Sequence, residues 1–133
     1  MSDALQVTRT ERGWAGHFIC AHDCRFRRNT LIECGETRIV VSTVGAMAWT
    51  GDKEFREVGC DRYYETMAFH AAYDGKYWDV DVSEDVDFSA PCAVSLPGAD
   101  DAANDMHEAV VTEIMENLAQ GGTYPKRERD NDE

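Results

Sequence analysis

The dipeptide Asp74-Gly75 constrains the fold more than any other feature, because it separates two runs that alternate between apolar and polar residues. Asp-Gly is a preferred pair for the two-residue type I′ turn of a β-hairpin, in which both central residues need positive φ. A two-residue loop also predicts the register of the flanking strands. One face of the hairpin then carries three apolar pairs: Ala71 with Trp78, Phe69 with Val80, and Met67 with Val82.

The other face of the predicted hairpin is polar along its second strand. Its pairs are Ala72 with Tyr77, His70 with Asp79, Ala68 with Asp81, and Thr66 with Ser83. A slip of one residue would place Phe69 opposite an aspartate, so the alternation argues against that register. We therefore expect His70 to lie across from Asp79, where the carboxylate favours the charged imidazolium.

Three runs in the first half of the chain have the composition of strands, at residues 13–20, 25–33 and 37–44. Gly35 lies in the turn between the last two. Within the third run, residues 39–44 are largely apolar on both faces, which is typical of a central strand that is covered on at least part of each side.

The remaining segments are predicted from how the alternation continues or stops. Beyond Ser83 the apolar side of the pattern continues through Val86 and Phe88. Two prolines then interrupt it, and residues 90–98 are predicted to form a loop. No structure is predicted for the connection at 45–59.

A helix is predicted from about residue 101 to 119. Its apolar residues recur at helical spacing and form one stripe: Ala103, Met106, Val110, Val111, Ile114 and Leu118. Asp100-Asp101 is the expected N-cap, and Gly121 the expected C-cap. We expect this helix to lie across the apolar face of the hairpin.

These elements predict an α+β fold, in which an antiparallel sheet of four to six strands carries one C-terminal helix packed on one face. With 133 residues, the chain is long enough for one core. Residues 1–122 are predicted to form a single domain and the charged residues 123–133 a disordered tail. Five cysteines without regular spacing, no signal-like N-terminus and no long apolar run favour a protein of the cytoplasm.

The charge of the chain is confined to its second half. Residues 1–60 carry eight Lys/Arg and eight Asp/Glu, whereas residues 61–133 carry five and eighteen, which accounts for the net charge of −13. Such a field repels nucleic acid and anionic membranes, and it favours cations or basic proteins as partners or serves only to keep the protein in solution. The candidate binding surface is the acidic side of the second hairpin strand and its continuation, formed by Asp79, Asp81, Asp85 and Asp87.

The stretch from His17 to Cys24 is the most metal-like part of the sequence. On an extended strand Cys20, His22 and Cys24 project to one face, and Cys and His are typical zinc ligands. Alternate residues of a straight strand lie about 7 Å apart, so a single ion would require the chain to bend. The competing interpretation is a buried Cys20 beside an exposed His22.

Other motifs are incomplete. His107-Glu108 begins like a zincin helix, but Val111 stands where the second histidine is required. The segment 79–90 lacks the glycine and the final glutamate of a calcium loop. No phosphate loop or nucleophile elbow is found, so no cofactor and no catalytic residue are predicted. The basic cluster at 25–28 is expected to pair with the protein's own carboxylates or with an acidic partner.

Two segments carry a resemblance to a known group of proteins. Residues 64–69 read Tyr-Glu-Thr-Met-Ala-Phe, and residues 103–111 read Ala-Asn-Asp-Met-His-Glu-Ala-Val-Val. Together with the acidic strand between them, they resemble a group of small uncharacterised proteins of tailed phages and prophages, over about residues 63–111. Where that group has a glycine before the His-Glu pair, this chain has Met106. The resemblance implies an origin in a mobile element and no particular activity.

The leading functional hypothesis is a non-enzymatic phage or mobile-element accessory protein that acts by protein binding through its acidic surface. Its partner would be a basic or nucleic-acid-binding host protein, which it would inhibit as an anti-CRISPR protein or a DNA mimic does. The alternative is a small metal-dependent hydrolase or zinc-binding protein that uses His17, Cys20, His22 and Cys24.

Overall fold

The computed structural model describes residues 6–12, 24–48, 55–58, 62–73, 75, 78–86, 88 and 92–124, with only the backbone of 78, 79 and 82–84. Within these residues the elements are β1 (Thr8–Glu11), β2 (Cys24–Cys34), β3 (Thr37–Met47), β4 (Tyr64–Tyr73), β5 (Trp78–Asp85), β6 (Ala93–Val94) and α1 (Asp100–Ala119).

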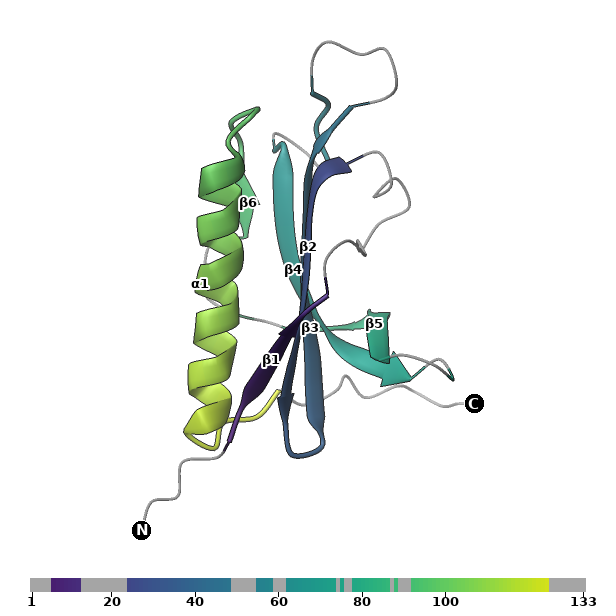
Figure 1. Cartoon of the computed structure of the whole chain (residues 1–133), viewed down its shortest axis with the longest axis vertical. Helices are drawn as coiled ribbons and strands as arrows, with labels where there is room; N and C mark the ends of the chain where they lie inside the picture. The colour runs from purple at the N-terminus through teal and green to yellow at the C-terminus, as the bar shows by residue number, and fades with distance from the viewer. Residues whose placement is uncertain are drawn as a thin grey trace.

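The strands form one antiparallel sheet with the order β1-β2-β3-β4-β5, and the short β6 pairs with β4. The helix α1 runs along one face of this sheet, and β5 curls away on the other side (Figure 1). The predicted α+β fold, an antiparallel sheet with a single C-terminal helix on one face, is confirmed.

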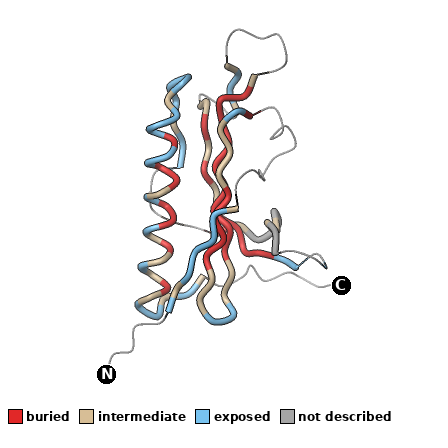
Figure 2. Tube along the Cα trace, viewed as in Figure 1, coloured by how far each residue is buried: buried red, intermediate tan, exposed pale blue. Residues whose placement is uncertain are grey.

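The strand β3 is the centre of the sheet. Every residue from Ile39 to Met47 is buried, as the continuous red segment in Figure 2 shows. This confirms the central strand that the apolar run predicted, and extends it three residues beyond Val44. Gly35, with a φ of 60°, lies in the turn that joins β2 to β3. A positive φ suits glycine because no Cβ opposes it.

The helix does not pack on the face of the hairpin that we expected. The main cluster beneath α1 contains Ile32, Ile39, Val41, Ala68, Val86, Val110, Val111, Ile114 and Leu118. Ala71 belongs instead to a smaller cluster on the other face, with Leu31, Val40 and Val80. The expectation was wrong because β2 and β3 carry the larger apolar surface on the Ala68 side, which the hairpin pattern alone cannot show.

The ends of α1 differ in how well the sequence predicted them. At the N-terminus the cap residue is Ala99 and no side chain caps the helix, so the predicted Asp100-Asp101 cap is wrong. Asp100 instead accepts a hydrogen bond of 2.5 Å from the hydroxyl of Tyr64. At the C-terminus Gly121 has a φ of 88°, and Gly122 N donates to Asn117 O at 2.8 Å. This is a Schellman motif, and the predicted glycine cap is confirmed.

The β4–β5 hairpin exists, but its register differs from the predicted one by two residues. Tyr73 pairs with Trp78, Ala72 with Asp79 and Ala71 with Val80, so four residues rather than two connect the strands. A shift of two leaves every side chain on its original face, and for this reason the alternation could not detect it. The predicted pair of His70 with Asp79 is not formed. His70 pairs with Ile39 of β3 and is buried.

An irregularity in the same hairpin reverses the faces of β5. Ala71 pairs with Val80, but Phe69, two residues earlier, pairs with Asp85, five residues later. Val80 consequently packs on the face away from α1, whereas Val86 packs beneath the helix. Asp85, which pairs with Phe69, lies on the same face as Val80. The side chain of Asp79 is not described, so the expectation of one continuous acidic side stays a prediction. Bulges of this kind bend a strand and increase its twist.

Several predictions concern segments at the limits of the described residues. The segment 90–98 is not entirely a loop, because β6 pairs Ala93 and Val94 with Glu65 and Tyr64. The strand predicted at 13–20 lies outside the described residues, as do residues 125–133 of the tail. Tyr124 packs against the main cluster. The boundary between domain and tail stays a prediction. Within the described residues, no helix combines the length and the apolar composition that crossing a bilayer requires.

Candidate functional site

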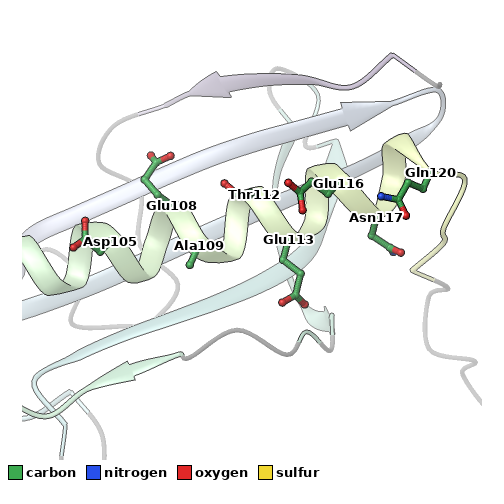
Figure 3. A pocket seen from close by; sticks show the side chains of 8 residues that line it. All are labelled: Asp105, Glu108, Ala109, Thr112, Glu113, Glu116, Asn117 and Gln120. Carbon is green, nitrogen blue, oxygen red and sulfur yellow. The ribbon is translucent and has the colours of Figure 1, made fainter.

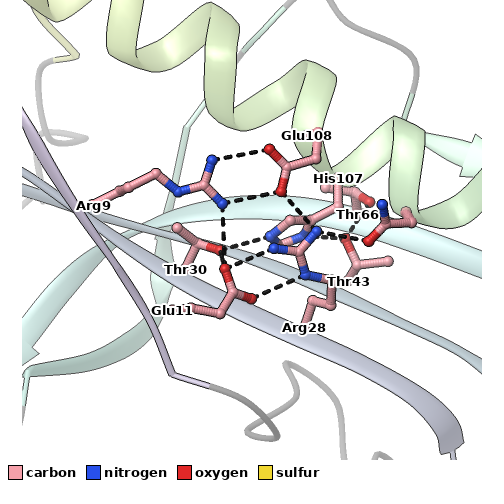
Figure 4. A network of polar contacts seen from close by, with 9 residues as sticks. Arg9, Glu11, Arg28, Thr30, Thr43, Thr66, His107 and Glu108 are labelled. Atoms are coloured by element: carbon pink, nitrogen blue, oxygen red, sulfur yellow. Dashed lines mark hydrogen bonds and ion pairs between the residues drawn. The ribbon is translucent and has the colours of Figure 1, made fainter.

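The candidate site lies where α1 crosses the first strands of the sheet, and His107 is its centre. The ring of His107 is fully buried between helix and sheet. Its Nε2 atom lies 2.8 Å from the Thr30 hydroxyl of β2, and its Nδ1 atom lies 2.7 Å from the Thr43 hydroxyl of β3 (Figure 4). Both ring nitrogens are thus hydrogen-bonded to strands that α1 covers.

The directions of these hydrogen bonds follow from the number of protons that each group can donate. Thr30 donates its only hydroxyl proton to Glu11 at 2.8 Å, so it accepts from Nε2–H of His107. The neutral ring then accepts at Nδ1, and Thr43 must donate to it. Thr43 in turn accepts from Thr66, whose hydroxyl lies 2.6 Å away. The protons therefore point in one direction, from Thr66 through Thr43, His107 and Thr30 to Glu11.

Ion pairs surround Glu11, the last acceptor in this series of hydrogen bonds, at the edge of the sheet. Arg9 of β1 holds Glu108 of α1 with N–O distances of 2.9 and 3.0 Å. Arg28 of β2 contacts Glu11 at 2.7 Å, Glu108 at 2.8 Å and the Asn104 side-chain oxygen at 2.8 Å. The pairing of Arg28 with the protein's own carboxylates agrees with one of the two roles predicted for the basic cluster. Together these groups tie β1, β2 and α1 to one another (Figure 4).

The electrostatic environment sets the protonation states of the site. Burial lowers the pKa of His107 to about 4, and the charge of Arg28 adds to this, so the ring is neutral at pH 7. The hydrogen bond from Arg9 and that from Arg28 lower the pKa of Glu108 to about 2 against the opposing effect of burial. Burial also opposes ionisation of Glu11, but the hydrogen bonds from Arg28 and Thr30 prevail and lower its pKa.

A hydroxyl, an imidazole and a carboxylate in sequence can move a proton or activate a nucleophile. Here the hydroxyls of Thr43 and Thr66 are fully buried beneath α1, so a substrate has no route to them. The network instead satisfies every polar group it contains and places the helix at one position on the sheet. Fully satisfied buried networks of this kind specify a unique packing arrangement.

The solvent-facing side of α1 forms a shallow acidic surface next to this network. The residues that line it are Asp105, Glu108, Ala109, Thr112, Glu113, Glu116, Asn117 and Gln120 (Figure 3). They recur every three or four residues and lie on the side opposite to the buried stripe. We call this set the acidic helix face.

Of the residues predicted as sites from the sequence, the structure describes the side chains of Cys24, Asp81 and Asp85. Cys24 is 2% exposed and packs with Val44 and Met47, which is the environment of a structural thiol. Cys20 and His22 lie outside the described residues, as does Asp87. No group of three potential metal ligands occurs in the part of the chain that the structure describes. Asp81 and Asp85 are half-buried on β5.

Sequence reasoning missed the His107 network, because it considered His107 as part of an incomplete zincin motif. The members of the network come from five elements: Glu11, Thr30, Thr43, Thr66 and His107. One signal was available for part of the network, because Thr43 lies within the largely apolar run at 39–44. The common face of the three threonines depends on the pairing of β2, β3 and β4, which places Thr30 beside Val41 and Thr43 beside Thr66.

Comparison with protein-family models, with curated proteins and with solved structures found no match to this chain.

Proposed function

We propose that this protein is a non-enzymatic binding protein whose acidic helix face docks on a basic surface of a partner protein. The observation that carries the proposal is the distribution of charge on α1. The helix Asp100–Ala119 contains six Asp or Glu residues and no Lys or Arg. Its buried side is apolar, so these charges are presented on the solvent side and at the edges of the helix.

The acidic helix face is also preorganised. Its apolar side anchors α1 in the main cluster, so the carboxylates are carried on a rigid element. Glu108 is held by Arg9 and Arg28, whereas Asp105 and Glu116 are exposed. Between them lie the small side chains of Ala109 and Thr112, which allow a partner to approach closely. Preorganised charge lowers the entropic cost of association.

The negative charge of the acidic helix face supports a partner with a basic surface. A basic or nucleic-acid-binding host protein fits this pattern, and the resemblance to phage and prophage proteins is consistent with an inhibitor of such a host factor.

The aspartates of β5 are a second part of the proposed surface. Asp79 pairs with Ala72, Asp81 lies within the irregular stretch that follows Val80, and Asp85 pairs with Phe69. We place the main surface on α1, because its carboxylates share one uninterrupted element.

The test compares two variants of equal charge change in affinity capture from the natural host. Asp105→Asn with Glu116→Gln removes two charges from the acidic helix face, and Glu36→Gln with Glu57→Gln removes two exposed charges elsewhere. We expect a host protein that is retained by the wild type and the control but lost from the helix variant. Duplex DNA should compete with it. Retention of the same partner by the helix variant would exclude this surface.

A further inference from the structure

We propose that β1 is a pH-gated edge strand, which leaves the sheet when His107 takes up a proton while the rest of the fold stays intact. The edge position of β1 and its contacts with the His107 network point to this role. The proposal is independent of what the acidic helix face binds.

The strand β1 is held mainly by polar contacts. Among the described strands it is the outermost on its side of the sheet, it has four residues, and all four are exposed. None of them belongs to an apolar cluster among the described residues; Val7, just before the strand, packs at the rim of the main cluster. Arg9 reaches Glu108, and Glu11 reaches Arg28 and Thr30. Exposed edge elements with few apolar contacts open at the lowest free energy.

The helix α1, in contrast, does not depend on His107 for its attachment. Six other helix residues are buried with it, namely Ala103, Met106, Val110, Val111, Ile114 and Leu118. Loss of the polar contacts around His107 would leave these apolar contacts in place. A disturbance at His107 is therefore relieved at lower cost by release of β1 than by release of the helix.

A proton on His107 conflicts with the closed arrangement. The neutral ring donates at Nε2 and accepts from Thr43 at Nδ1, as derived above. The imidazolium has two donors, so the hydroxyl of Thr43 would have to turn away and donate to Thr66, which then needs a new acceptor. The charge would also sit in a fully buried position. Departure of Glu11 with β1 opens the Thr30 side of the ring to water, which solvates the charge.

The charged groups that face His107 nearly balance. Among the described residues these are Arg9 and Glu11 from β1, Arg28 from β2 and Glu108 from α1, while β3 and β4 contribute only the hydroxyls of Thr43 and Thr66. Release of β1 removes one cation and one anion. The gain on opening therefore comes from hydration of the imidazolium and not from a change in net local charge.

Proton linkage gives the size of the effect. The pKa of His107 is about 4 in the closed state, and a solvated histidine has a pKa of about 6.5. If opening hydrated the ring completely, the ratio of open to closed molecules would be about 20-fold larger at pH 5 than at pH 7. Because α1 and Thr43 still cover the Nδ1 side of the ring, about 20-fold is the upper limit. Opening would also leave the outer edge of β2 without its partner, which is a site where another strand can add.

Amide hydrogen exchange at pH 7 and pH 5, corrected for intrinsic rates, tests the proposal on the full chain. We expect the amides directed across the β1–β2 ladder, those of Thr8, Thr10 and Arg12 and of Leu31 and Glu33, to lose protection by up to about 20-fold, while α1 and β3 keep theirs. His107→Gln should abolish this pH dependence. His70→Gln, which changes another buried histidine of the sheet, should preserve it. Equal losses in β1 and α1, or unchanged protection in β1, would overturn the proposal.

A second measurement uses only the wild-type protein, so it still tests the proposal if the His107→Gln variant does not fold. NMR spectra over the same pH range follow the His107 ring and the β1 amide signals in the wild-type protein. Coupled opening requires that both change with the same midpoint. If β1 signals change at a pH at which the His107 ring does not titrate, the gate is not His107.

Discussion

The Nδ1 atom of His107 lies 2.7 Å from the hydroxyl of Thr43, and this contact joins the single helix to the central strand of the sheet. Both residues are fully buried. The hydroxyl of Thr43 also accepts from Thr66, so one side chain links α1, β3 and β4. The contact makes the position of the helix on the sheet dependent on hydrogen-bond geometry as well as on apolar packing.

Replacement of Thr43 by valine should therefore destabilise the protein. The change keeps the shape of the side chain but leaves the Nδ1 atom of His107 without a donor, and burying an unsatisfied polar group costs about 1–3 kcal/mol. Urea unfolding measures the difference. Thr112→Val on the solvent side of α1 is the matched control and should change stability by less than about 0.5 kcal/mol. Equal effects of the two would contradict a role for the network in stability.

The stability of the protein should fall in mild acid. The pKa of His107 is lowered to about 4 on folding, so the unfolded chain binds a proton before the folded protein does. The contribution is complete above about pH 6.5 and is lost as the pH falls toward 4, by at most about 3 kcal/mol. A second loss follows below about pH 4.5, where the carboxylate of Glu108, with a pKa of about 2, is protonated in the unfolded chain. In denaturant titrations His107→Gln should flatten the first phase only.

Gly45 should not tolerate a side chain. A Cβ at this position would overlap the ring of Tyr64 and lie 2.7 Å from the backbone oxygen of Tyr63. Since Tyr64 is fully buried, its ring has little space to move, and overpacking of this kind costs about 1–3 kcal/mol. Thermal unfolding of Gly45→Ala measures the cost, with Glu36→Ala in the exposed β2–β3 turn as the control. A melting temperature equal to that of the wild type would show that Tyr64 can shift.

Phe69 should be the side chain with the largest effect on the sheet face away from α1. It is 3% exposed, and truncation of a buried phenylalanine costs about 3–5 kcal/mol. Chemical unfolding of Phe69→Ala should show this loss, whereas Leu96→Ala, which is 64% exposed, should change little. A small effect of Phe69→Ala would mean that this face of the sheet collapses around the vacancy.

Two truncations of the C-terminus should distinguish the contribution of Tyr124 to stability from that of the charged residues that follow it. Deletion of residues 125–133 should leave the melting temperature nearly unchanged, because so charged a segment can bury few contacts. Deletion of 124–133 also removes a side chain that packs against the main cluster, and should lower it further. Calorimetry of both proteins tests this, and a drop of many degrees for the shorter deletion would show that the charged residues dock.

The sequence by itself determined the elements whose signals are local. The spacing of Met106, Val110, Ile114 and Leu118 predicted α1, since one helix face must be apolar to be buried, and Gly121 predicted its end. The apolar run at 39–44 predicted a central strand, because both of its faces must be covered. These patterns specify α1 and β3 without reference to any distant residue.

Only the tertiary structure decided how these elements meet. The hairpin register could slip by two residues without moving a side chain to the other face, so the alternation around Asp74-Gly75 could not determine it. The face that α1 covers depended on the summed apolar surface of β2, β3 and β4. The His107 network joins residues from Glu11 to His107 that no local pattern connects. Strand pairing brings its hydroxyls together, and the energy of a buried hydrogen bond depends on that geometry and not on separation along the chain.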